Sequence, residues 1–318
     1  MPETSSSAGE PSDSPRVSVI IPTHNRRDLV RFAIESVLEQ EPHGMPLELI
    51  VVDDGSKDGT AEVVARYPTV RYVRSEACNI SSARNAGIAI ARGQWFGFLD
   101  DDDVWLPHKM KRITAALELH PEARIVMSSA YSCDWNLNPD HVWQPPAPQR
   151  RGGIYQGFMQ NVMTPSALVI HKSVFDTLGG FDANAHRIED RELCLRAARA
   201  GVPFLTIDEP LILYRRRSRV DGDQVLAGFR STLALLRREF REQHADQPSL
   251  LRQQVYELNL RRWCTKALLE AAREQALDRN WLEARRFDTL ALRVSPLHWV
   301  YHRVLFRKKP GTAKRAKM

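Results

Sequence analysis

The sequence predicts an α/β fold in which helices flank a mostly parallel sheet, with a helical region appended at the C-terminal end. Two observations predict this class. Short, β-rich apolar runs alternate with helical stretches from residue 17 onward, and beyond Val225 the pattern is helical almost throughout. Alternation with short connections is typical of parallel strands joined by helices. We expect a disordered lead-in over 1–16, an α/β domain over 17–222, helices over 223–309 and a basic tail over 310–318.

The first expected strand covers residues 17–21 and is bounded by Pro22. The polar residues Thr23, His24 and Asn25 then lead into a helix, which we expect to bury one face. That face consists of Val30, Ala33, Val37 and Leu38. A second apolar run over 47–52 predicts a buried strand that ends in Asp53 and Asp54.

The next elements are marked mainly by their caps. Residues 58–60 (DGT) predict the start of a helix that continues to about Arg66, and a short strand is expected over 70–73. Ser81 is expected to cap a helix that runs to Arg92, where Gly93 stops it. The following apolar run over 94–99 predicts a strand.

Four carboxylates follow this strand directly, from Asp100 to Asp103. Side chains alternate along an extended backbone, so we expect Asp100 and Asp102 to project together and Asp101 and Asp103 to point the other way. Two like charges on one face favour a cation between them, and oxygen ligands suit Mg2+ or Mn2+. The alternative is a solvated acidic turn. Because ligands bind at the carboxyl ends of parallel strands, the three polar strand ends predict one pocket.

The remainder of the domain is less regular. Residues 132–165 are rich in Pro, Gln, Trp and Gly and predict an irregular lobe on the acceptor side. An apolar run over 164–170 and a helix over 174–181 follow, and Glu189 and Asp190 open another helix that Gly201 ends. Two short strands are expected, over 203–207 and 211–214.

The formal net charge of this 318-residue chain is +6, and the basic excess lies at its end, because eight Lys and Arg residues but no Asp or Glu follow Asp288. Interleaved aromatic and basic residues suit an anionic membrane surface, and a solvated basic end is the alternative. No apolar stretch approaches the ~20 residues that span a bilayer. Four scattered cysteines without a CxxC pair fit a reducing compartment. We expect a cytoplasmic protein with peripheral contact to the inner membrane.

Six stretches in order give the chain a family resemblance. They are residues 17–25 (VSVIIPTHN), 50–56 (IVVDDGS), 80–87 (ISSARNAG), 98–105 (FLDDDDVW), 179–182 (GGFD) and 189–190 (ED). Over about residues 17–215 the chain resembles the family 2 glycosyltransferases, inverting enzymes of the GT-A fold that use nucleotide-activated sugars. The resemblance implies a GT-A domain and the transfer of a sugar from a nucleoside diphosphate to an acceptor.

The resemblance also implies residue roles on the donor side. Pro22, Thr23, Asn25, Asp53 and Asp54 would bind the nucleotide, although one of the two aspartates could instead form an Asx-turn with Gly55. Arg84 would meet the diphosphate or a pocket carboxylate, and its alternative is a surface salt bridge of little energetic weight.

The family's metal motif maps onto Asp100, Asp101 and Asp102. By similarity, Asp102 coordinates a Mn2+ or Mg2+ ion, Asp100 contacts the ribose or the metal, and Asp101 helps to bind the donor. The cation would neutralise charge on the departing diphosphate.

The pair Glu189 and Asp190 maps onto the family's catalytic position. Asp190 would be the base that takes the acceptor proton, and Glu189 would contact the donor. A helix N-terminus favours an ionised carboxylate, so we expect Asp190 to be ready to accept a proton at neutral pH. Plain helix capping is the alternative.

One position departs from the family pattern. Many members carry a histidine three residues after the position of Tyr214, and this chain has Arg217 there. Arginine cannot ligate a cation but pairs with phosphate, so Arg217 is expected to contact the donor.

The leading hypothesis is an inverting bacterial glycosyltransferase that moves a sugar from an NDP-sugar to a carbohydrate or lipid-linked acceptor in cell-surface polysaccharide or glycolipid synthesis. The alternatives are a catalytically degenerate nucleotide-sugar-binding protein and a metal-dependent nucleotidyltransferase. We expect no nucleic-acid partner, because nothing else in the chain supports a base-reading surface.

Overall fold

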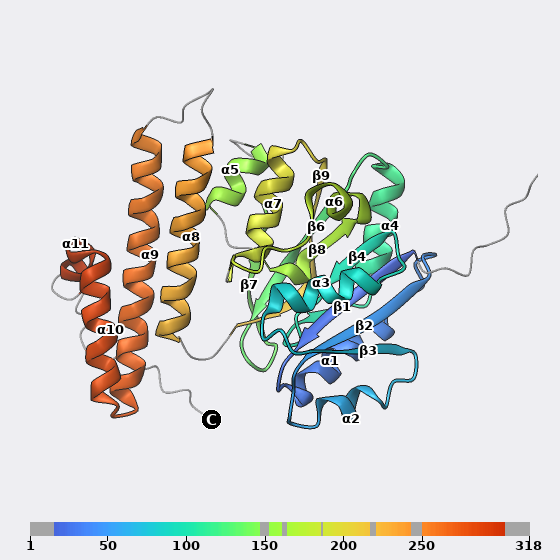
Figure 1. Ribbon diagram of the computed structural model, residues 1–318, viewed down its shortest axis with the longest axis horizontal. Helices are drawn as coiled ribbons and strands as arrows, with labels where there is room; N and C mark the ends of the chain where they lie inside the picture. Colours follow the sequence, from blue (N-terminus) through green and yellow to red (C-terminus); the bar gives the residue numbers. More distant parts are fainter. Residues whose placement is uncertain are drawn as a thin grey trace, which may run out of the picture. The chain divides into compact units, whose positions relative to one another are not determined.

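The computed structural model describes residues 16–146, 153–160, 164–185, 187–216, 221–242 and 250–302. The chain divides into two compact units between Arg216 and Arg217. Apart from Arg16, the expected lead-in over 1–16 lies outside the described residues, and so does the expected basic tail over 310–318. The first unit is an α/β structure and the second is helical (Figure 1).

The described residues of the first unit form a nine-stranded sheet in the order β3-β2-β1-β4-β8-β6-β9-β5, with β7 paired to β6. Strands β1, β2, β3 and β4 are parallel to one another, and β8 is antiparallel to both neighbours. The bounds are β1 Val17–Thr23, β2 Leu47–Asp54, β3 Val70–Ser75, β4 Trp95–Phe98, β5 Val104–Trp105, β6 Ile125–Cys133, β7 Pro139–Trp143, β8 Leu168–His171 and β9 Phe204–Arg215.

Helices cover both faces of this sheet. The helices of this unit are α1 Arg27–Leu38, α2 Thr60–Val64, α3 Ile80–Ile90, α4 Lys109–Leu119, α5 Gly153–Gln160, α6 Lys172–Leu178 and α7 Glu189–Arg199, with a 3-10 turn η1 at Pro165–Ala167. Buried residues of α1, α2 and α4 join the odd-numbered residues of β1 in one core. Helix α3 packs on the other face, because a Cβ on Gly87 would lie 2.5 Å from Ile20 Cγ2. Glycine at this position therefore permits the close approach of α3.

Three expectations for the first half of the unit need correction. The cap of α3 is Asn79, whose side chain accepts from the backbone N–H groups of Ser81 and Ser82, so Ser81 is not the cap. The helix ends at Ile90, before Gly93; a Cβ on Gly93 would instead lie 2.7 Å from the backbone nitrogen of Ser18. Leu38 is 44% exposed, and Ile34 takes the place on the buried face of α1 that we expected for it.

Two expectations for the second half were also wrong. Much of the stretch expected to be irregular is ordered, since β6 and β7 pair antiparallel and residues 153–160 form α5. The two short strands expected after Gly201 are one strand, β9, which pairs with β6 through register shifts between Ser128 and Tyr131. These shifts let a single strand pass Glu209 and Pro210, which the sequence pattern indicated as a break.

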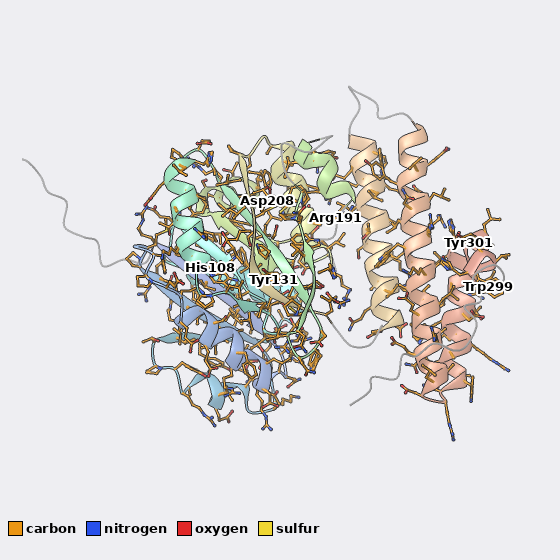
Figure 2. All side chains as sticks on the ribbon, turned by 180° about the vertical axis from the view of Figure 1, so that it is seen from behind. His108, Tyr131, Arg191, Asp208, Trp299 and Tyr301 are labelled. Carbon is orange, nitrogen blue, oxygen red and sulfur yellow. The ribbon has the colours of Figure 1, made fainter. Side chains whose placement is uncertain are left out.

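The second unit consists, within the described residues, of α8 Gly222–Glu242, α9 Leu250–Leu277, α10 Trp281–Val294 and α11 Pro296–Val300. Its core joins α8, α9 and α10. Trp299, labelled in Figure 2, donates from Nε1 to Asp288 Oδ1 at 3.0 Å and so ties α11 to α10. Among the described helices of the chain, none has the length and apolar character needed to cross a bilayer.

Candidate active site

The polar ends of β1, β2 and β4 meet at one edge of the sheet. Thr23 is the register partner of Asp53, and β1 lies between β2 and β4. The Thr23 hydroxyl donates to Asp101 Oδ2 at 2.7 Å, across 78 residues of chain. Strand direction therefore brings together residues that are distant in sequence, as expected for the carboxyl edge of a parallel sheet.

The four carboxylates form a turn, and their pairing differs from the expected one. Strand β4 ends at Phe98, and the Asp103 N–H donates to the Asp100 carbonyl oxygen at 3.0 Å. Because the backbone is turned, strand alternation does not apply here. Asp101 and Asp102 share one cation and Asp100 pairs with another, so the ion pairs in the structure do not follow the expected alternation.

Arg26 is the cation that Asp101 and Asp102 share. Its Nη1 donates to Asp101 Oδ1 and to Asp102 Oδ2, both at 2.7 Å, and its side chain is 30% exposed. Burial raises the pKa of Asp101 to about 6, although Arg26 opposes this shift. Sequence reasoning missed Arg26; the available signal was a basic residue directly after the polar end of the first strand.

Asp103 has a different role in the same turn. It is buried, its Oδ2 accepts from the Ser166 hydroxyl at 2.6 Å, and its Oδ1 accepts from the Arg215 N–H at 2.9 Å. Burial, with the nearby charges of Asp102 and Asp100, raises its pKa well above the ordinary value. Asp103 thus fastens the turn to η1 and to the end of β9.

Arg84 connects the acidic turn to α7. Its Nη2 donates to Asp100 Oδ1 at 2.6 Å and its Nη1 donates to Glu189 Oε1 at 2.7 Å. The side chain is only 1% exposed and lies over the Phe181 ring. The alternative of a surface salt bridge is therefore wrong, and Arg84 meets two carboxylates of the site.

Glu189 and Asp190 lie in the first turn of α7, and both are buried. Asp190 Oδ1 accepts from the N–H of Arg191, which Figure 2 labels, at 2.7 Å. Glu189 Oε2 and Asp190 Oδ2 are buried and have no hydrogen-bond partner among the described residues. Burial, together with the charge of Glu189, raises the pKa of Asp190 to about 7. The helix N-terminus, which we expected to favour the ionised carboxylate, is opposed here by this loss of solvation.

The predicted nucleotide-binding residues of β1 and β2 hold loops at this edge. Asn25 has a φ of 51° and accepts from the Lys57 N–H at 2.8 Å. Asp53 accepts from the Ser56 N–H at 2.8 Å and from the Tyr72 hydroxyl at 2.7 Å, and so holds the loop after β2.

Asp54 and Pro22 complete this group. Asp54 accepts from the N–H groups of Cys78 and Asn79 at 3.0 and 2.7 Å, and so fixes the loop before α3. Pro22 is buried inside β1, where strand pairing with β2 continues to Thr23. Arg217 lies outside the described residues.

The end of β9 closes the site. Arg215 donates from Nε to the Asp102 carbonyl oxygen at 2.8 Å, and its guanidinium also donates to the Trp135 carbonyl oxygen. Burial and the charges of the Asp103, Asp100, Asp102 and Asp190 carboxylates raise the pKa of Tyr214. The same tyrosine therefore lies within electrostatic range of both the acidic turn and the α7 carboxylate.

The donor set of the turn fits a hard divalent cation that is shared with a substrate. Asp101 and Asp102 already hold a cationic group between two carboxylate oxygens at 2.7 Å each. Among the residues that the structure describes, no three Asp, Glu, His or Cys side chains form a complete metal site. Mg2+ is commonly held by one or two carboxylates plus substrate phosphates, which matches this arrangement.

In open α/β sheets, ligands bind at the carboxyl ends of the strands, which is where these carboxylates lie. The family model described as "Glycosyl transferase family 2" matches residues 18–179, about half of the chain. The chain belongs to this family, and the protein is a glycosyltransferase.

The similar proteins agree with this assignment. An uncharacterized glycosyltransferase of Haemophilus influenzae is 28% identical over 213 residues, which are 65% of this chain and 71% of that protein. The amylovoran biosynthesis glycosyltransferase AmsB of Erwinia amylovora is 28% identical over 257 residues, 75% of this chain and 80% of AmsB. Several others match over only 29–30% of their length.

A solved structure shows the same fold. The mannosyltransferase PcManGT of Pyrobaculum calidifontis, crystallised with GDP-Man and Mn2+, superposes with a TM-score of 0.59 at 20% identity. The superposition covers 95% of this chain and 90% of that one. The GT-A fold expected from the motifs is thereby confirmed.

Proposed function

We propose that this protein is an inverting glycosyltransferase that moves a sugar from a nucleoside-diphosphate sugar to a saccharide acceptor during the synthesis of a cell-surface polysaccharide. The observation that carries this proposal is Asp190. Its Oδ2 is buried without a partner among the described residues, while Oδ1 is fixed by a backbone bond. A carboxylate with one oriented oxygen and a pKa of about 7 suits a general base at neutral pH.

The donor would be held at the acidic turn. Asp102, together with Asp100, would hold a Mn2+ or Mg2+ ion, and Asp101 and Arg26 would flank it. When bound, the cation would neutralise charge on the leaving diphosphate. The relative PcManGT was crystallised with GDP-Man and Mn2+, and this supports an NDP-sugar and a divalent metal for this chain. Pro22, Thr23, Asn25, Asp53, Asp54 and Arg217 remain proposed donor-side residues.

Asp190 would then act on the acceptor. Its Oδ2 accepts the proton of the attacking hydroxyl, the new glycosidic bond forms at the anomeric carbon, and the bond to the diphosphate breaks on the opposite face. Arg84 pairs with Glu189 at 2.7 Å and so fixes this carboxylate beside Asp190. Trp135, which is 42% exposed and packs beside Arg215, would offer an aromatic platform to the acceptor sugar.

The polysaccharide assignment is supported by the name of AmsB, a relative in amylovoran biosynthesis. Family membership sets aside the alternative of a nucleotidyltransferase. A degenerate, binding-only protein would bind nucleotide with Mn2+ yet neither transfer nor hydrolyse any sugar across UDP-, GDP- and dTDP-sugar donors.

The decisive variant is Asp190→Asn. We expect it to lower kcat about 10²–10⁴-fold because the base is lost. The Kd of the donor nucleotide in the presence of Mn2+, measured by calorimetry, should change less than about twofold, because the base does not contribute to binding of the donor in its ground state. Asp28→Asn is the control, because the Asp28 side chain is 90% exposed. Wild-type turnover in Asp190→Asn would exclude Asp190 as the base.

Membrane contact is a separate part of the proposal. The residues after His302 include seven Lys and Arg and no Asp or Glu. We expect this end to bind vesicles that contain phosphatidylglycerol, at the cytoplasmic face of the inner membrane. Replacing its Lys and Arg residues by Gln should abolish co-sedimentation with such vesicles, and unchanged co-sedimentation would reject this contact.

A further inference from the structure

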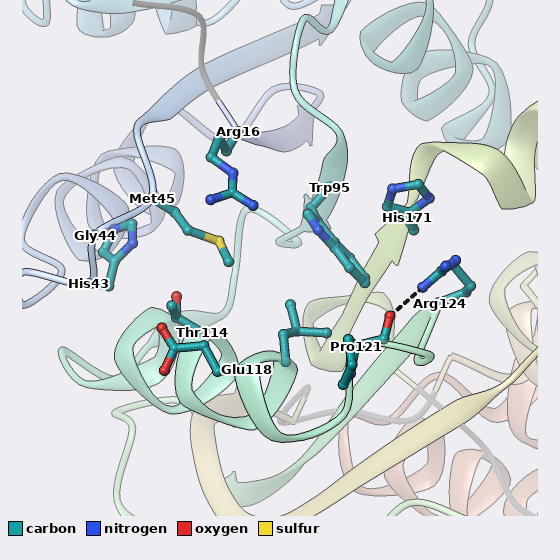
Figure 3. A pocket seen from close by; sticks show the side chains of 11 residues that line it. Arg16, His43, Gly44, Met45, Trp95, Thr114, Glu118, Pro121, Arg124 and His171 are labelled. Carbon is teal, nitrogen blue, oxygen red and sulfur yellow. Dashed lines mark hydrogen bonds between the residues drawn. The ribbon is translucent and has the colours of Figure 1, made fainter. Parts of the chain in front are cut away.

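A second pocket lies at the opposite edge of the sheet from the acidic turn. It has a volume of about 470 Å³ and is drawn in Figure 3. Arg16 precedes β1, Met45 precedes β2 and Trp95 begins β4, so the pocket is at the amino ends of these parallel strands. At about 3.3 Å per residue, the seven residues of β1 separate the two edges by roughly 20 Å. The pocket is therefore distinct from the candidate active site.

Two polar atoms in this pocket lack a partner. His43 Nδ1 and Thr114 Oγ1 are buried, and neither forms a hydrogen bond with the residues that the structure describes. Buried polar groups in proteins are nearly always hydrogen-bonded, so these two atoms leave hydrogen-bonding capacity at the pocket wall that water or the hydroxyl groups of a ligand can use. Burial lowers the pKa of His43, so its ring is neutral at pH 7 and can either donate or accept.

The charges around the pocket leave one positive charge in excess. The Arg16 and Glu118 side chains have no ion-pair partner within the described part of the chain. Arg124 donates from Nη1 to the carbonyl oxygens of Pro121 and Ala123, which fixes its guanidinium without neutralising it. His171 is neutral at pH 7, because burial and Arg124 lower its pKa. Two arginines and one glutamate favour a ligand with a single negative charge.

The pocket also has an apolar side. Trp95, Met45 and Leu117 line it, and the Trp95 ring is held edge-on by His171, with 4.9 Å between the ring centroids. Figure 3 shows Thr114 and Glu118 reaching into the same space from α4. An apolar wall faced by a few hydrogen-bonding groups is typical of sites for amphipathic small molecules. A sugar ring, with one apolar face and hydroxyls at its rim, has these properties.

We propose that this pocket is a second saccharide site that binds a sugar residue carrying one carboxylate, such as a uronic acid. The carboxylate pairs with Arg16 and Arg124, and the ring packs against Trp95. The hydroxyls bond to His43, Thr114 and Glu118, and the carboxylate of Glu118 disfavours a phosphate in the same place. The site lies away from the reacting groups, so it binds the saccharide without changing it.

Saturation-transfer NMR and calorimetry on the full chain test this site, with sodium D-glucuronate, D-glucose and inorganic phosphate as probes. We expect glucuronate to bind in the millimolar range and glucose to bind about tenfold more weakly, because it lacks the charge-assisted bonds. Arg16→Gln should weaken glucuronate binding about tenfold. Arg16 has no partner in the described chain to lose, so this variant should fold normally. Arg124→Gln provides a second test.

Two controls locate the binding. Arg112→Gln changes an exposed arginine of α4 that pairs with Glu209 outside the pocket, and it should leave glucuronate binding unchanged. UDP or GDP with Mn2+ should not displace glucuronate. The proposal is overturned by undetectable glucuronate binding at about 10 mM, by phosphate binding as tightly as glucuronate, by displacement with nucleotide, or by full binding in both pocket variants.

Discussion

Two arginines at the candidate active site each bridge two carboxylates, but they do so in different surroundings. Arg26 holds Asp101 and Asp102 at 2.7 Å, and Arg84 holds Asp100 and Glu189 at 2.6 and 2.7 Å. The Arg26 side chain is 30% exposed and the Arg84 side chain 1%. Breaking a buried ion pair by removing one partner costs much of the free energy of unfolding, whereas a partly solvent-exposed ion pair can exchange its partners. Arg84 therefore belongs to the structural framework of the site, whereas Arg26 can release its carboxylates to another cation.

The largest effect is expected for Arg84→Met. It leaves Asp100 and Glu189 without their buried counter-charge, which typically costs about 3–5 kcal/mol of the free energy of unfolding. Urea unfolding measures this, and glycosyl transfer should be lost as well. Arg112→Met is the matched control, because it breaks an arginine–glutamate pair whose arginine is 57% exposed. Equal costs for the two variants would contradict the distinction between the bridges.

The next effect concerns Asp190, which follows the Arg84-bound Glu189. Its pKa of about 7 lies above the ordinary 3.8, so ionisation opposes folding. Stability from this group is complete below pH 4 and is lost as the pH rises toward 7 and above. As the pH rises from 4 to 8, the free energy of unfolding of Asp190→Asn should increase relative to that of the wild type by on the order of 2–4 kcal/mol. Thermal unfolding across pH checks this, and a constant difference would show an unshifted pKa.

The smallest effect is expected for Arg26→Gln. Because the arginine would compete with the proposed metal ion for Asp102, we expect the metal-free protein to bind Mn2+ severalfold more tightly after the substitution, as measured by electron paramagnetic resonance. The free energy of unfolding should fall by no more than about 1 kcal/mol. Arg27→Gln, at the neighbouring exposed position, should change neither quantity. Weaker Mn2+ binding in Arg26→Gln would mean that the arginine orients Asp102 for the metal.

Much of the fold was predictable because its signals are local. The apolar runs of β1, β2 and β4 and the motifs at their ends lie within stretches of a few residues. The errors arose where the tertiary structure overrode such a signal. Asn79 caps α3 in place of Ser81, and its side chain also donates to the Ala183 carbonyl oxygen, which lies far along the chain. Strand β9 continues past Pro210 because β6 pairs with it on both sides of the irregularity.

The sequence by itself determined the strand–helix alternation, the acidic run after β4 and the carboxylate pair that opens α7. These are properties of neighbouring residues. Only the tertiary structure decided which carboxylate meets which cation, since Arg26 and Asp101 are 75 residues apart and Arg84 and Glu189 are 105 apart. It also decided the protonation of Asp190, because the loss of solvation that raises a pKa depends on every element packed around the group.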